Sequence, residues 1–246
     1  PTVSSLHPTR QTGRVCGRYA LGLDSAALEE YFEVVDNKFP TWTPRWNIAP
    51  TAMVPLVMER QGESGPPERV LGPARWSLTP PWSDTLDTPY PTFNARSETA
   101  ATKPTFRQAV KHSRAILPAS GYFEWHTEGR VKTPHYIHPP DGGVWGLAGL
   151  FSLWSDGTQS LVTATILTRE APTRLEWIHP RSPIALGPED WSVWLDPRIE
   201  GSEGLIDDAR ERSERVYTTA LEYAVLPLRG DGPELIAPGV DPRRLD

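Results

Sequence analysis

The amino-acid sequence predicts a single α+β domain in which strands outnumber helices. No linker-like segment divides its 246 residues, so one domain with a sizeable core is the simplest organisation. Short, β-prone apolar runs recur along most of the chain, whereas only a few segments space their apolar residues as a helix does. The 27 prolines and 10 tryptophans indicate a loop-rich fold with aromatic platforms, although most tryptophans in proteins serve packing.

The first half of the chain predicts two helices and a β-hairpin. In order, we expect a helix capped by Asp24 and Ser25 and running to Phe32, strands at 53–58 and 69–78 around a turn at 62–67, and a helix from Pro104 through Lys111. Residues 93–99 are too polar and too short for a core element, so we expect a capped loop there. Pro80 and Pro81 fix an extended loop that holds Trp82 where it could stack on a base.

The second half predicts mostly strands. We expect strands at 115–118, 121–125, 135–138, 145–154, 160–167, 223–228 and 234–236, with helices at 188–195 and 204–214. Residues 178–184 read as a loop bounded by prolines. The chain has no repeat, no Gly-rich phosphate loop and no His/Cys spacing typical of zinc, so we expect neither a metal nor a small-molecule cofactor.

Composition predicts a cytoplasmic protein. No apolar run is long enough to span a membrane, and the first fifteen residues lack the apolar core of a signal peptide. Those residues are rich in Ser, Thr, Pro and Arg without hydrophobic periodicity. We therefore expect residues 1–15 to be a disordered leader, absent from the mature protein, and residues 16–246 to form the domain.

The net charge of −6 argues against a generic nucleic-acid coat, because non-specific affinity for a polyanion needs clustered cations. The charges are unevenly distributed, however. Residues 94–114 carry five basic side chains against one acid, whereas residues 189–214 are dominated by Asp and Glu. We expect one basic face and one acidic face, the basic one supplied by Arg96, Lys103, Arg107, Lys111 and Arg114.

Cys16 is the only cysteine, so it can form neither an internal disulfide nor a multi-thiolate metal site. A lone cysteine is most often a small buried hydrophobe, and any chemical task would be nucleophilic. Val15 could mark a GTG start codon, and an initiating Met before Cys would be trimmed, which would leave Cys16 first. Its amine and thiol could then trap an aldehyde as a thiazolidine, or the amine could serve as base for acyl transfer.

Two further residues have an ordinary interpretation beside a chemical one. Glu124 lies between aromatic residues in a strand-like run, and an exposed edge-strand position is the favoured interpretation. If it were buried, its pKa would rise and it could act as a general acid. His179 lies in the Pro-bounded loop, where a single histidine is usually a satisfied polar residue.

Taken together, these segments resemble the SRAP family, the SOS response-associated peptidase-like proteins that cross-link covalently to abasic sites in single-stranded DNA. The resemblance covers nearly the whole chain beyond residue 15. It rests on an ordered set of short motifs: Cys16-Gly17-Arg18-Tyr19, Trp46-Asn47-Ile48-Ala49-Pro50, Arg75-Trp76-Ser77-Leu78 with Pro81-Trp82, Asn94-Ala95-Arg96-Ser97-Glu98-Thr99, Gly121-Tyr122-Phe123-Glu124-Trp125, Ala148-Gly149-Leu150, Ile178-His179-Pro180-Arg181 and Gly232-Pro233-Glu234-Leu235-Ile236.

The resemblance implies a fold and a set of roles. The fold would be α+β with a largely antiparallel, barrel-like sheet flanked by short helices. Cys16 would condense with the abasic aldehyde, Asn94 would hold the amino end, and Glu124 and His179 would be the acid–base pair. The resemblance further implies DNA contacts from Arg18, Arg96 and Arg181 to the backbone and from Pro50 and Trp82 to flanking bases. The family is also proposed to remove its own leader.

The chain departs from the family pattern in places. Pro180 and Ser182 stand where the family commonly has Asp and Met, the loop at 83–92 looks longer than usual, and the segment at 226–232 looks shortened.

Three functions compete at this point: an abasic-site cross-linker in the DNA damage response, a cysteine peptidase or N-terminal-nucleophile amidase, and a non-covalent single-strand binder. For the first, the expected partner is single-stranded DNA carrying abasic sites, bound by a monomer without a membrane or a cofactor.

Overall fold

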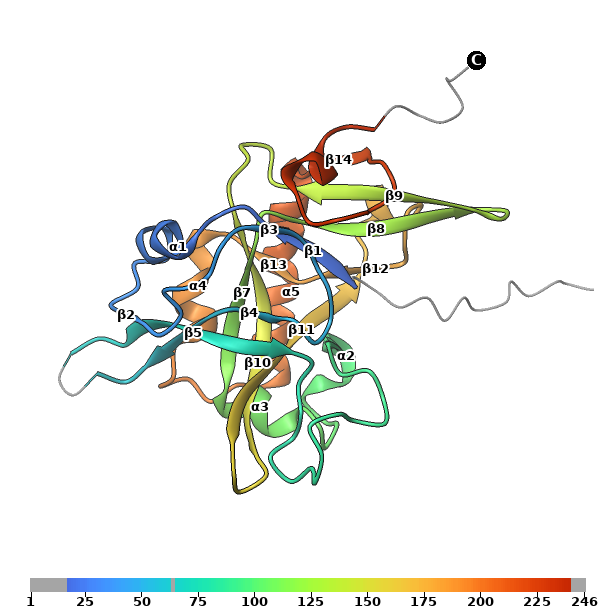
Figure 1. The fold of residues 1–246 in the computed structure, drawn as a ribbon. Helices are drawn as coiled ribbons and strands as arrows, with labels where there is room; N and C mark the ends of the chain where they lie inside the picture. Colours follow the sequence, from blue (N-terminus) through green and yellow to red (C-terminus); the bar gives the residue numbers. More distant parts are fainter. Residues whose placement is uncertain (1–16, 63–64, 240–246) are drawn as a thin grey trace, which may run out of the picture.

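The computed structural model describes residues 17–62 and 65–239, and within them the strands form two sheets (Figure 1). Cys16 and the predicted leader at 1–15 lie outside the described residues. The strands are β1 (Arg18–Leu21), β2 (Asp36–Asn37), β3 (Arg45–Ile48), β4 (Met53–Arg60), β5 (Glu68–Trp76), β6 (Asn94–Arg96), β7 (Arg114–Ala119), β8 (Gly121–Glu128), β9 (Val131–His138), β10 (Trp145–Ser155), β11 (Ser160–Glu170), β12 (Arg181–Pro183), β13 (Ala185–Leu186) and β14 (Leu221–Ala224).

The larger sheet closes into a barrel. Its strands follow the order β12-β11-β10-β7-β4-β5-β2, and β11 also pairs with β5 in parallel through Thr163 opposite Arg75. The path β11-β10-β7-β4-β5 therefore returns to its own first strand, which removes the exposed edges that an open sheet would have. The other pairings along this path are antiparallel. The predicted α+β fold with a largely antiparallel, barrel-like sheet is confirmed.

The smaller sheet has the order β14-β9-β8-β1-β3 and lies above the barrel in the view of Figure 1. The chain passes between the two sheets at Ser120, which separates β7 from β8. Ser120 donates its backbone N–H to the carbonyl oxygen of Ala20 at 2.8 Å, and its hydroxyl accepts from the N–H of Gly22 at 2.9 Å. This corner fixes β1 beside β8.

Helices pack outside the sheets, as expected from their single apolar faces. Asp24 accepts a hydrogen bond from the N–H of Ala27 at 2.9 Å and so caps the first helix, as predicted. The helix predicted from Pro104 begins three residues later, and the one predicted at 204–214 is longer. The bounds are α1 (Ser25–Tyr31), α2 (Ser97–Ala100), α3 (Arg107–His112), α4 (Pro188–Leu195) and α5 (Glu203–Thr219).

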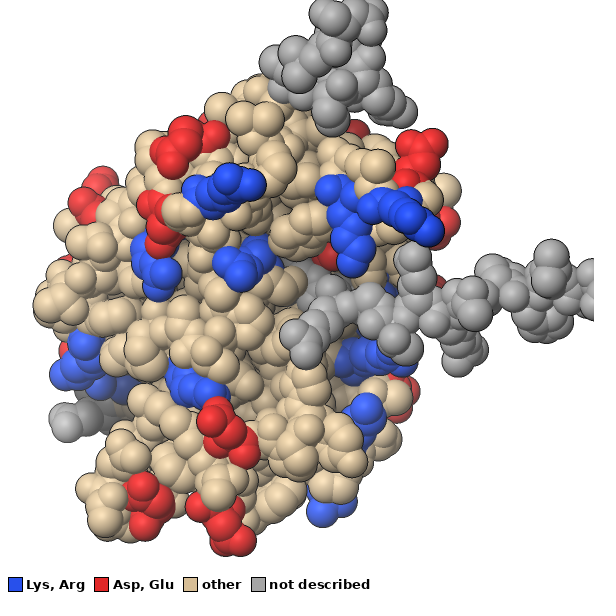
Figure 2. All heavy atoms as spheres, turned by 45° about the vertical axis from the view of Figure 1, so that its right-hand side comes forward, with Lys and Arg blue, Asp and Glu red and all other residues tan. Residues whose placement is uncertain are grey.

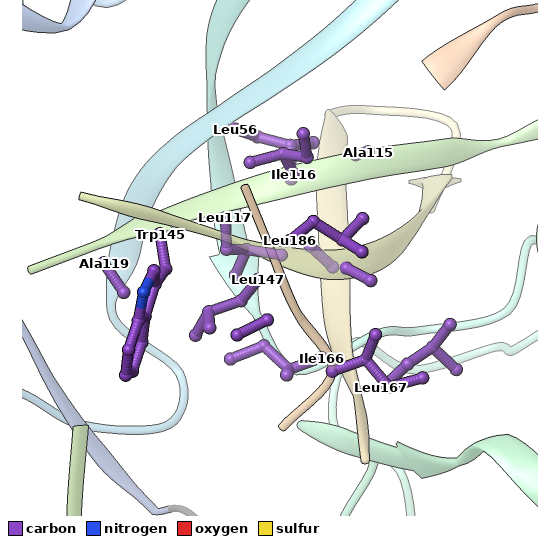
Figure 3. Packing of buried hydrophobic residues seen from close by; sticks show 14 of the residues in the cluster. Leu56, Ala115, Ile116, Leu117, Ala119, Trp145, Leu147, Ile166, Leu167 and Leu186 are labelled. Atoms are coloured by element: carbon purple, nitrogen blue, oxygen red, sulfur yellow. The ribbon is translucent and has the colours of Figure 1, made fainter. Parts of the chain in front are cut away.

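The barrel interior is filled by branched aliphatic side chains from successive strands (Figure 3). Leu56 of β4, Leu117 of β7, Leu147 of β10 and Ile166 of β11 are all essentially inaccessible to solvent. Burying each such side chain contributes about 1.5–3 kcal/mol to folding. The interior is therefore a packed core, and the chemistry must be sought outside it.

Three predicted elements differ in type from those observed, and the strand predicted at 223–228 ends already at Ala224 of β14. Residues 93–99 form β6 and α2, because β6 pairs in parallel with β11 and so gains backbone partners that a short polar run lacks by itself. The loop at 178–184 contains β12, which pairs with the end of β11. The strand predicted at 234–236 is part of a 3-10 helix, Pro233–Ile236, whose first turn is closed by the N–H of Leu235 bonding to Gly232.

Arg114 does not contribute to a basic face. The side chain is buried, and its guanidinium donates to five backbone carbonyl oxygens at 2.7–3.2 Å. It ties α3 to the end of α4 and to the segment that follows, because the acceptors belong to Val110, Lys111, Trp194, Asp196 and Ile199. The predicted basic stretch therefore loses one of its five surface cations to a structural task.

Candidate functional site

Glu124 is buried on an interior strand, which corrects the favoured prediction of an exposed edge position. Only 3% of Glu124 is accessible, and β8 is paired with β9 on one side and β1 on the other. The strand can approach its neighbours closely because it begins at Gly121, where a Cβ would lie 2.6 Å from the carbonyl oxygen of Ile137. A carboxyl group in this position is shielded from water, as a proton-transferring group requires.

The register of β1 on β8 places the beginning of the described chain beside Glu124. Arg18, the first residue of β1, is opposite Phe123, and Tyr19 is opposite Tyr122. The two strands are antiparallel, so Gly17, the residue directly before Arg18, lies toward Glu124. The structure thus brings the amino end of the folded domain next to the carboxylate, although Cys16 itself lies outside the described residues.

The loop that carries His179 is attached to β8. The ring nitrogen Nδ1 of His126 lies 2.6 Å from the carbonyl oxygen of Trp177, and a carbonyl can only accept, so this nitrogen donates. His126 follows Glu124 by two residues and therefore shares its face of the strand. A second connection joins Tyr122 of β8 to Ser182 of β12, whose hydroxyl oxygens are 3.2 Å apart. These contacts hold the His179 loop against the strand of Glu124.

His179 is a neutral imidazole with a defined orientation. Its Nδ1 accepts a hydrogen bond from the N–H of Arg181 at 3.1 Å, and the ring proton then resides on Nε2. Burial lowers the pKa of His179 below its ordinary value, outweighing the hydrogen bond with Arg181. The imidazole is therefore available as a base at neutral pH. On protonation, the carbonyl oxygen of Arg181, 3.3 Å from Nδ1, becomes the acceptor.

Arg181 is held by a carboxylate. Its two terminal nitrogens lie 2.6 and 3.0 Å from the two carboxylate oxygens of Glu98, and one of them also donates to the carbonyl oxygen of Thr168 at 2.7 Å. Burial, the largest single influence, raises the pKa of Glu98, but the hydrogen bond from Arg181, a backbone hydrogen bond and the charges of Arg181 and Arg210 together lower the pKa overall. This bidentate pair neutralises the guanidinium and orients it. Its predicted DNA contact stays a prediction.

Asn94 and Arg96 belong to the same region through β11. Asn94 is opposite Ile166 and Arg96 is opposite Thr168, the residue whose carbonyl oxygen accepts from Arg181. Asn94 is half-buried, whereas Arg96 is exposed and directly precedes α2. Arg96 makes no ion pair with any described residue, so its charge faces solvent.

Arg18 lies on β1, the strand that pairs with β8 on the edge away from β9, and its side chain is held by a hydrogen bond. Its guanidinium donates to the side-chain oxygen of Asn47 on β3 at 2.7 Å. Asn47 in turn donates to the carbonyl oxygen of Gly230 and receives support from Asp231, which accepts from the N–H groups of Trp46 and Asn47. The shortened segment at 226–232 thus braces the strand that positions Arg18.

Pro50 and Trp82 lie on two loops of different character. Pro50 is half-buried after β3, beside Thr51, whose backbone adopts a positive φ of 72° and bonds to the carbonyl oxygen of Trp76 at 2.8 Å. Trp82 is 68% exposed. Its loop is anchored to β11, because Thr79 donates its backbone N–H to the hydroxyl oxygen of Thr163 and its carbonyl oxygen accepts from the same hydroxyl. The loop is also anchored to β10, because Trp154 donates to the carbonyl oxygen of Ser83 at 2.8 Å.

The face shown in Figure 2 carries Lys and Arg side chains around its centre, while Asp and Glu lie mostly toward its margin. Such an arrangement attracts a polyanion locally despite the negative total. Within residues 17–62 and 65–239, no group of three or more His, Cys, Asp or Glu side chains is arranged to hold a metal ion. No helix in the described part of the chain is both long and apolar enough to cross a membrane.

Sequence reasoning missed three residues that shape this region. Glu98 orients Arg181, Asn47 orients Arg18, and Trp177 connects the His179 loop to His126. Glu98 and Asn47 were within motifs that the resemblance used, so their positions offered a signal. For Trp177 the sequence offered no signal beyond its place two residues before His179, because which of the ten tryptophans are exposed is decided by tertiary structure.

The chain belongs to the SRAP family. Residues 15–224 match the family described as SOS response associated peptidase, which confirms the resemblance found in the sequence. Abasic site processing protein YoqW of Bacillus subtilis is 32% identical over 188 residues, covering 75% of this chain and 81% of that protein. Abasic site processing protein YedK of Escherichia coli is 31% identical over 233 residues, covering 91% of this chain and all of that protein.

More distant comparisons agree. Abasic site processing protein HMCES of Xenopus tropicalis is 29% identical over 221 residues, covering 74% of this chain and 66% of that protein. A crystal structure of a protein from Bacteroides thetaiotaomicron superposes with a TM-score of 0.77 at 20% identity, covering 92% of this chain and 100% of that one, and shows the shared fold. A phage-related protein from Bordetella bronchiseptica superposes with a TM-score of 0.61 at 28% identity, covering 85% of this chain and 94% of that one.

Proposed function

We propose that the protein captures abasic sites in single-stranded DNA, through a covalent thiazolidine formed at an amino-terminal Cys16, as part of the response to DNA damage. The names of the bacterial and animal relatives refer to abasic site processing, which supports this substrate. The observation that carries the proposal is the register of β1 on β8. It directs the chain preceding Arg18 toward a carboxylate that is only 3% exposed.

The proposed reaction is a condensation that releases one water molecule. The amine nitrogen of Cys16 attacks the aldehyde carbon of the ring-opened sugar, and loss of water leaves a C=N bond. The thiol sulfur then adds to the imine carbon while its proton moves to the nitrogen, which closes a five-membered ring. No oxidant or metal is required. Because both attacking atoms belong to one residue, the second bond forms with high effective molarity.

The site residues would divide the proton transfers. Glu124, shielded from water, would donate a proton to the ring oxygen when the sugar opens, and to the hydroxyl that leaves as water when the imine forms. His179, neutral and oriented through Nδ1, would accept the proton released by the attacking amine. The Asn94 side chain would hold the amine of Cys16. Arg18, Arg96 and Arg181 would position the phosphates, and Pro50 and Trp82 would support the flanking bases.

The proposal requires a free amine at Cys16. While residue 15 is attached, the nitrogen is an amide whose lone pair is delocalised into the carbonyl group, and it cannot form an imine. Translation from Val15 with Met removal would free it, and so would proteolytic removal of the leader by the protein itself. The name of the family includes a peptidase, so a cysteine peptidase acting through Cys16 is the competing proposal. A cytoplasmic monomer remains our expectation.

A denaturing gel tests the proposal. Protein that begins at Cys16 is incubated with single-stranded DNA carrying one abasic site, beside Cys16→Ala and Cys16→Ser. We expect a denaturation-resistant adduct from the wild type only, and less adduct with duplex DNA. A Cys16→Ala protein that forms as much adduct as the wild type would refute the thiazolidine. Cleavage of a peptide substrate without any DNA adduct would favour the peptidase.

A further inference from the structure

Trp177 is an exposed aromatic residue two positions before His179, and the proposed reaction gives it no role. All ten tryptophans are described, and only Trp82 and Trp177 among them are exposed, whereas the other eight are buried or half-buried. Trp177 is 49% exposed, so about half of its surface remains available for a ligand. The Trp177 side chain therefore calls for an explanation beyond core packing.

Two histidines hold the Trp177 ring in place. Its centroid lies 5.0 Å from that of His126 and 4.9 Å from that of His135, which meets it edge-on at 86°. The backbone of Trp177 is fixed as well, because its carbonyl oxygen accepts from His126. His135 is anchored in turn by Glu222 of β14, whose carboxylate is 3.0 Å from its Nδ1. The indole thus packs against His126 of β8 and His135 of β9, and Glu222 of β14 holds His135 in place.

This position is close to the proposed reaction centre. Trp177 precedes His179 by two residues, and His126, which contacts its ring and its backbone, follows Glu124 by two residues on the same face of β8. Same-face neighbours on a strand are about 6.6 Å apart. The Trp177 ring therefore contacts His126, and His126 is the next residue on the same face of β8 as Glu124, the proposed acid.

An abasic strand offers a natural occupant for such a ring. Where a base is missing, the neighbouring base loses a stacking partner and presents a free π-face. A preordered indole beside the reaction centre can cover that face without losing much side-chain entropy, since the two histidines already restrict it. Stacking of bases on aromatic side chains is tolerant of sequence, as recognition of damage at any position requires.

We propose that Trp177 stacks on the base adjacent to the abasic site in single-stranded DNA. The inference rests on the proposed function, which supplies the substrate, and adds a binding subsite to it. Trp82, on a loop anchored to β10 and β11, would support a different flanking base. The two exposed tryptophans would then hold the DNA at two separate points.

Equilibrium binding to an unreactive lesion tests this subsite separately from the chemistry. The probes are single-stranded oligonucleotides with a tetrahydrofuran abasic analogue, which has no aldehyde. In one set both neighbours are adenine, and in two others the 5′ or the 3′ neighbour is a second analogue without a base. We expect wild type to lose affinity by about 5-fold or more when one particular neighbour is removed. Trp177→Leu should bind all the probes with nearly equal affinity.

The controls separate stacking from folding. Trp177→Leu keeps an apolar cover over the histidines, Trp177→Phe keeps a π-face and should retain part of the discrimination, and Val35→Ala removes another exposed apolar side chain, 66% accessible, and should behave as wild type. Full discrimination in a folded Trp177→Leu protein would overturn the subsite. Failure of adduct formation on true abasic DNA, with discrimination intact, would instead refute the proposed reaction alone.

Discussion

The five-stranded sheet and the loop at 79–92 both carry residues of the candidate site, but the sheet buries its residue and the loop exposes it. Glu124 on β8 is 3% accessible, and Trp82 on the loop is 68% accessible. Groups that transfer protons gain from exclusion of water, whereas groups that bind a strand of DNA must reach it from the surface. Proton transfer and strand binding are therefore expected at structurally distinct positions of this fold.

Exposure does not mean that the loop is loose. Hydrogen bonds from Thr79 to Thr163 and from Trp154 to Ser83 secure both sides of the Trp82 turn, and Arg75 pairs with Asp87 at 2.6 Å. Both regions are therefore preorganised, and they differ in access to solvent. We therefore expect substitution of the buried Glu124 to change the rate of adduct formation strongly, and substitution of exposed residues to change DNA binding less and in a salt-dependent way.

The largest effect is expected from Glu124→Gln, which keeps the shape and removes the acidic proton. The rate of adduct formation should fall by roughly 100-fold or more, the usual contribution of a general acid. Single-turnover kinetics on abasic single-stranded DNA measure it. Glu128→Gln, at the exposed end of the same strand, is the matched control and should react as wild type. Equal losses in both variants would break the distinction between buried and exposed carboxylates.

Arg181→Ala should destabilise the fold, whereas Arg96→Ala should not. Removing Arg181 leaves the partly buried Glu98 carboxylate without its bidentate partner, at a cost of about 1–2 kcal/mol in the free energy of unfolding. Arg96 is exposed and forms no ion pair with a described residue, so its removal leaves stability near the wild-type value. Urea unfolding measures both. Identical midpoints for Arg181→Ala and wild type would show that the pair is not structural.

Removal of Arg96 or Arg18 should weaken binding to single-stranded DNA and flatten its salt dependence. Each lost phosphate contact reduces the slope of log K against log salt by roughly 0.7 for single strands. Fluorescence anisotropy at several salt concentrations measures the slope. Arg60→Ala removes a cation that pairs with Asp36 and Glu68 and should leave it unchanged. Unchanged slopes in both variants would place the DNA on another face.

The smallest effect concerns pH. Burial lowers the pKa of His179 and of His135, in the latter case against an opposing contribution from Glu222. Below the ordinary histidine pKa of about 6.5, the unfolded chain binds protons that the folded protein resists, so stability is complete above that pH and falls below it. Urea midpoints at about pH 7.5 and pH 5.5 should differ less in the double variant His135→Asn/His179→Asn than in wild type. An unchanged difference would contradict the lowered pKa values.

Local sequence patterns were sufficient for much of the fold. The capped helix α1, the β4–β5 hairpin and α4 follow from side-chain spacing and turn residues, and the structure has them as predicted. The barrel was implied by the resemblance alone, because its closure depends on β5 meeting β11 far along the chain. For the same reason β6 was missed, since its partner strand, not its own sequence, makes it a strand.

The candidate site shows the same limit. The motifs identified Glu124, His179 and the arginines, but the burial of Glu124 depends on which strands flank β8. Partners such as Glu98 for Arg181 and the two histidines around Trp177 are distant in sequence, and only the folded chain brings them together. The site roles themselves stay predictions until they are measured.

The requirement for a free amine at Cys16 is tested by comparing two forms of the protein that differ only in the leader. One begins at Cys16 and the other retains residues 1–15, and intact mass confirms each before and after incubation with abasic single-stranded DNA. The account predicts that both bind the DNA, but that only the form with the free amine keeps it after denaturation, with a mass increase equal to the DNA minus one water. A long form that cross-links as fast as the short one, with its leader still attached, would contradict the account.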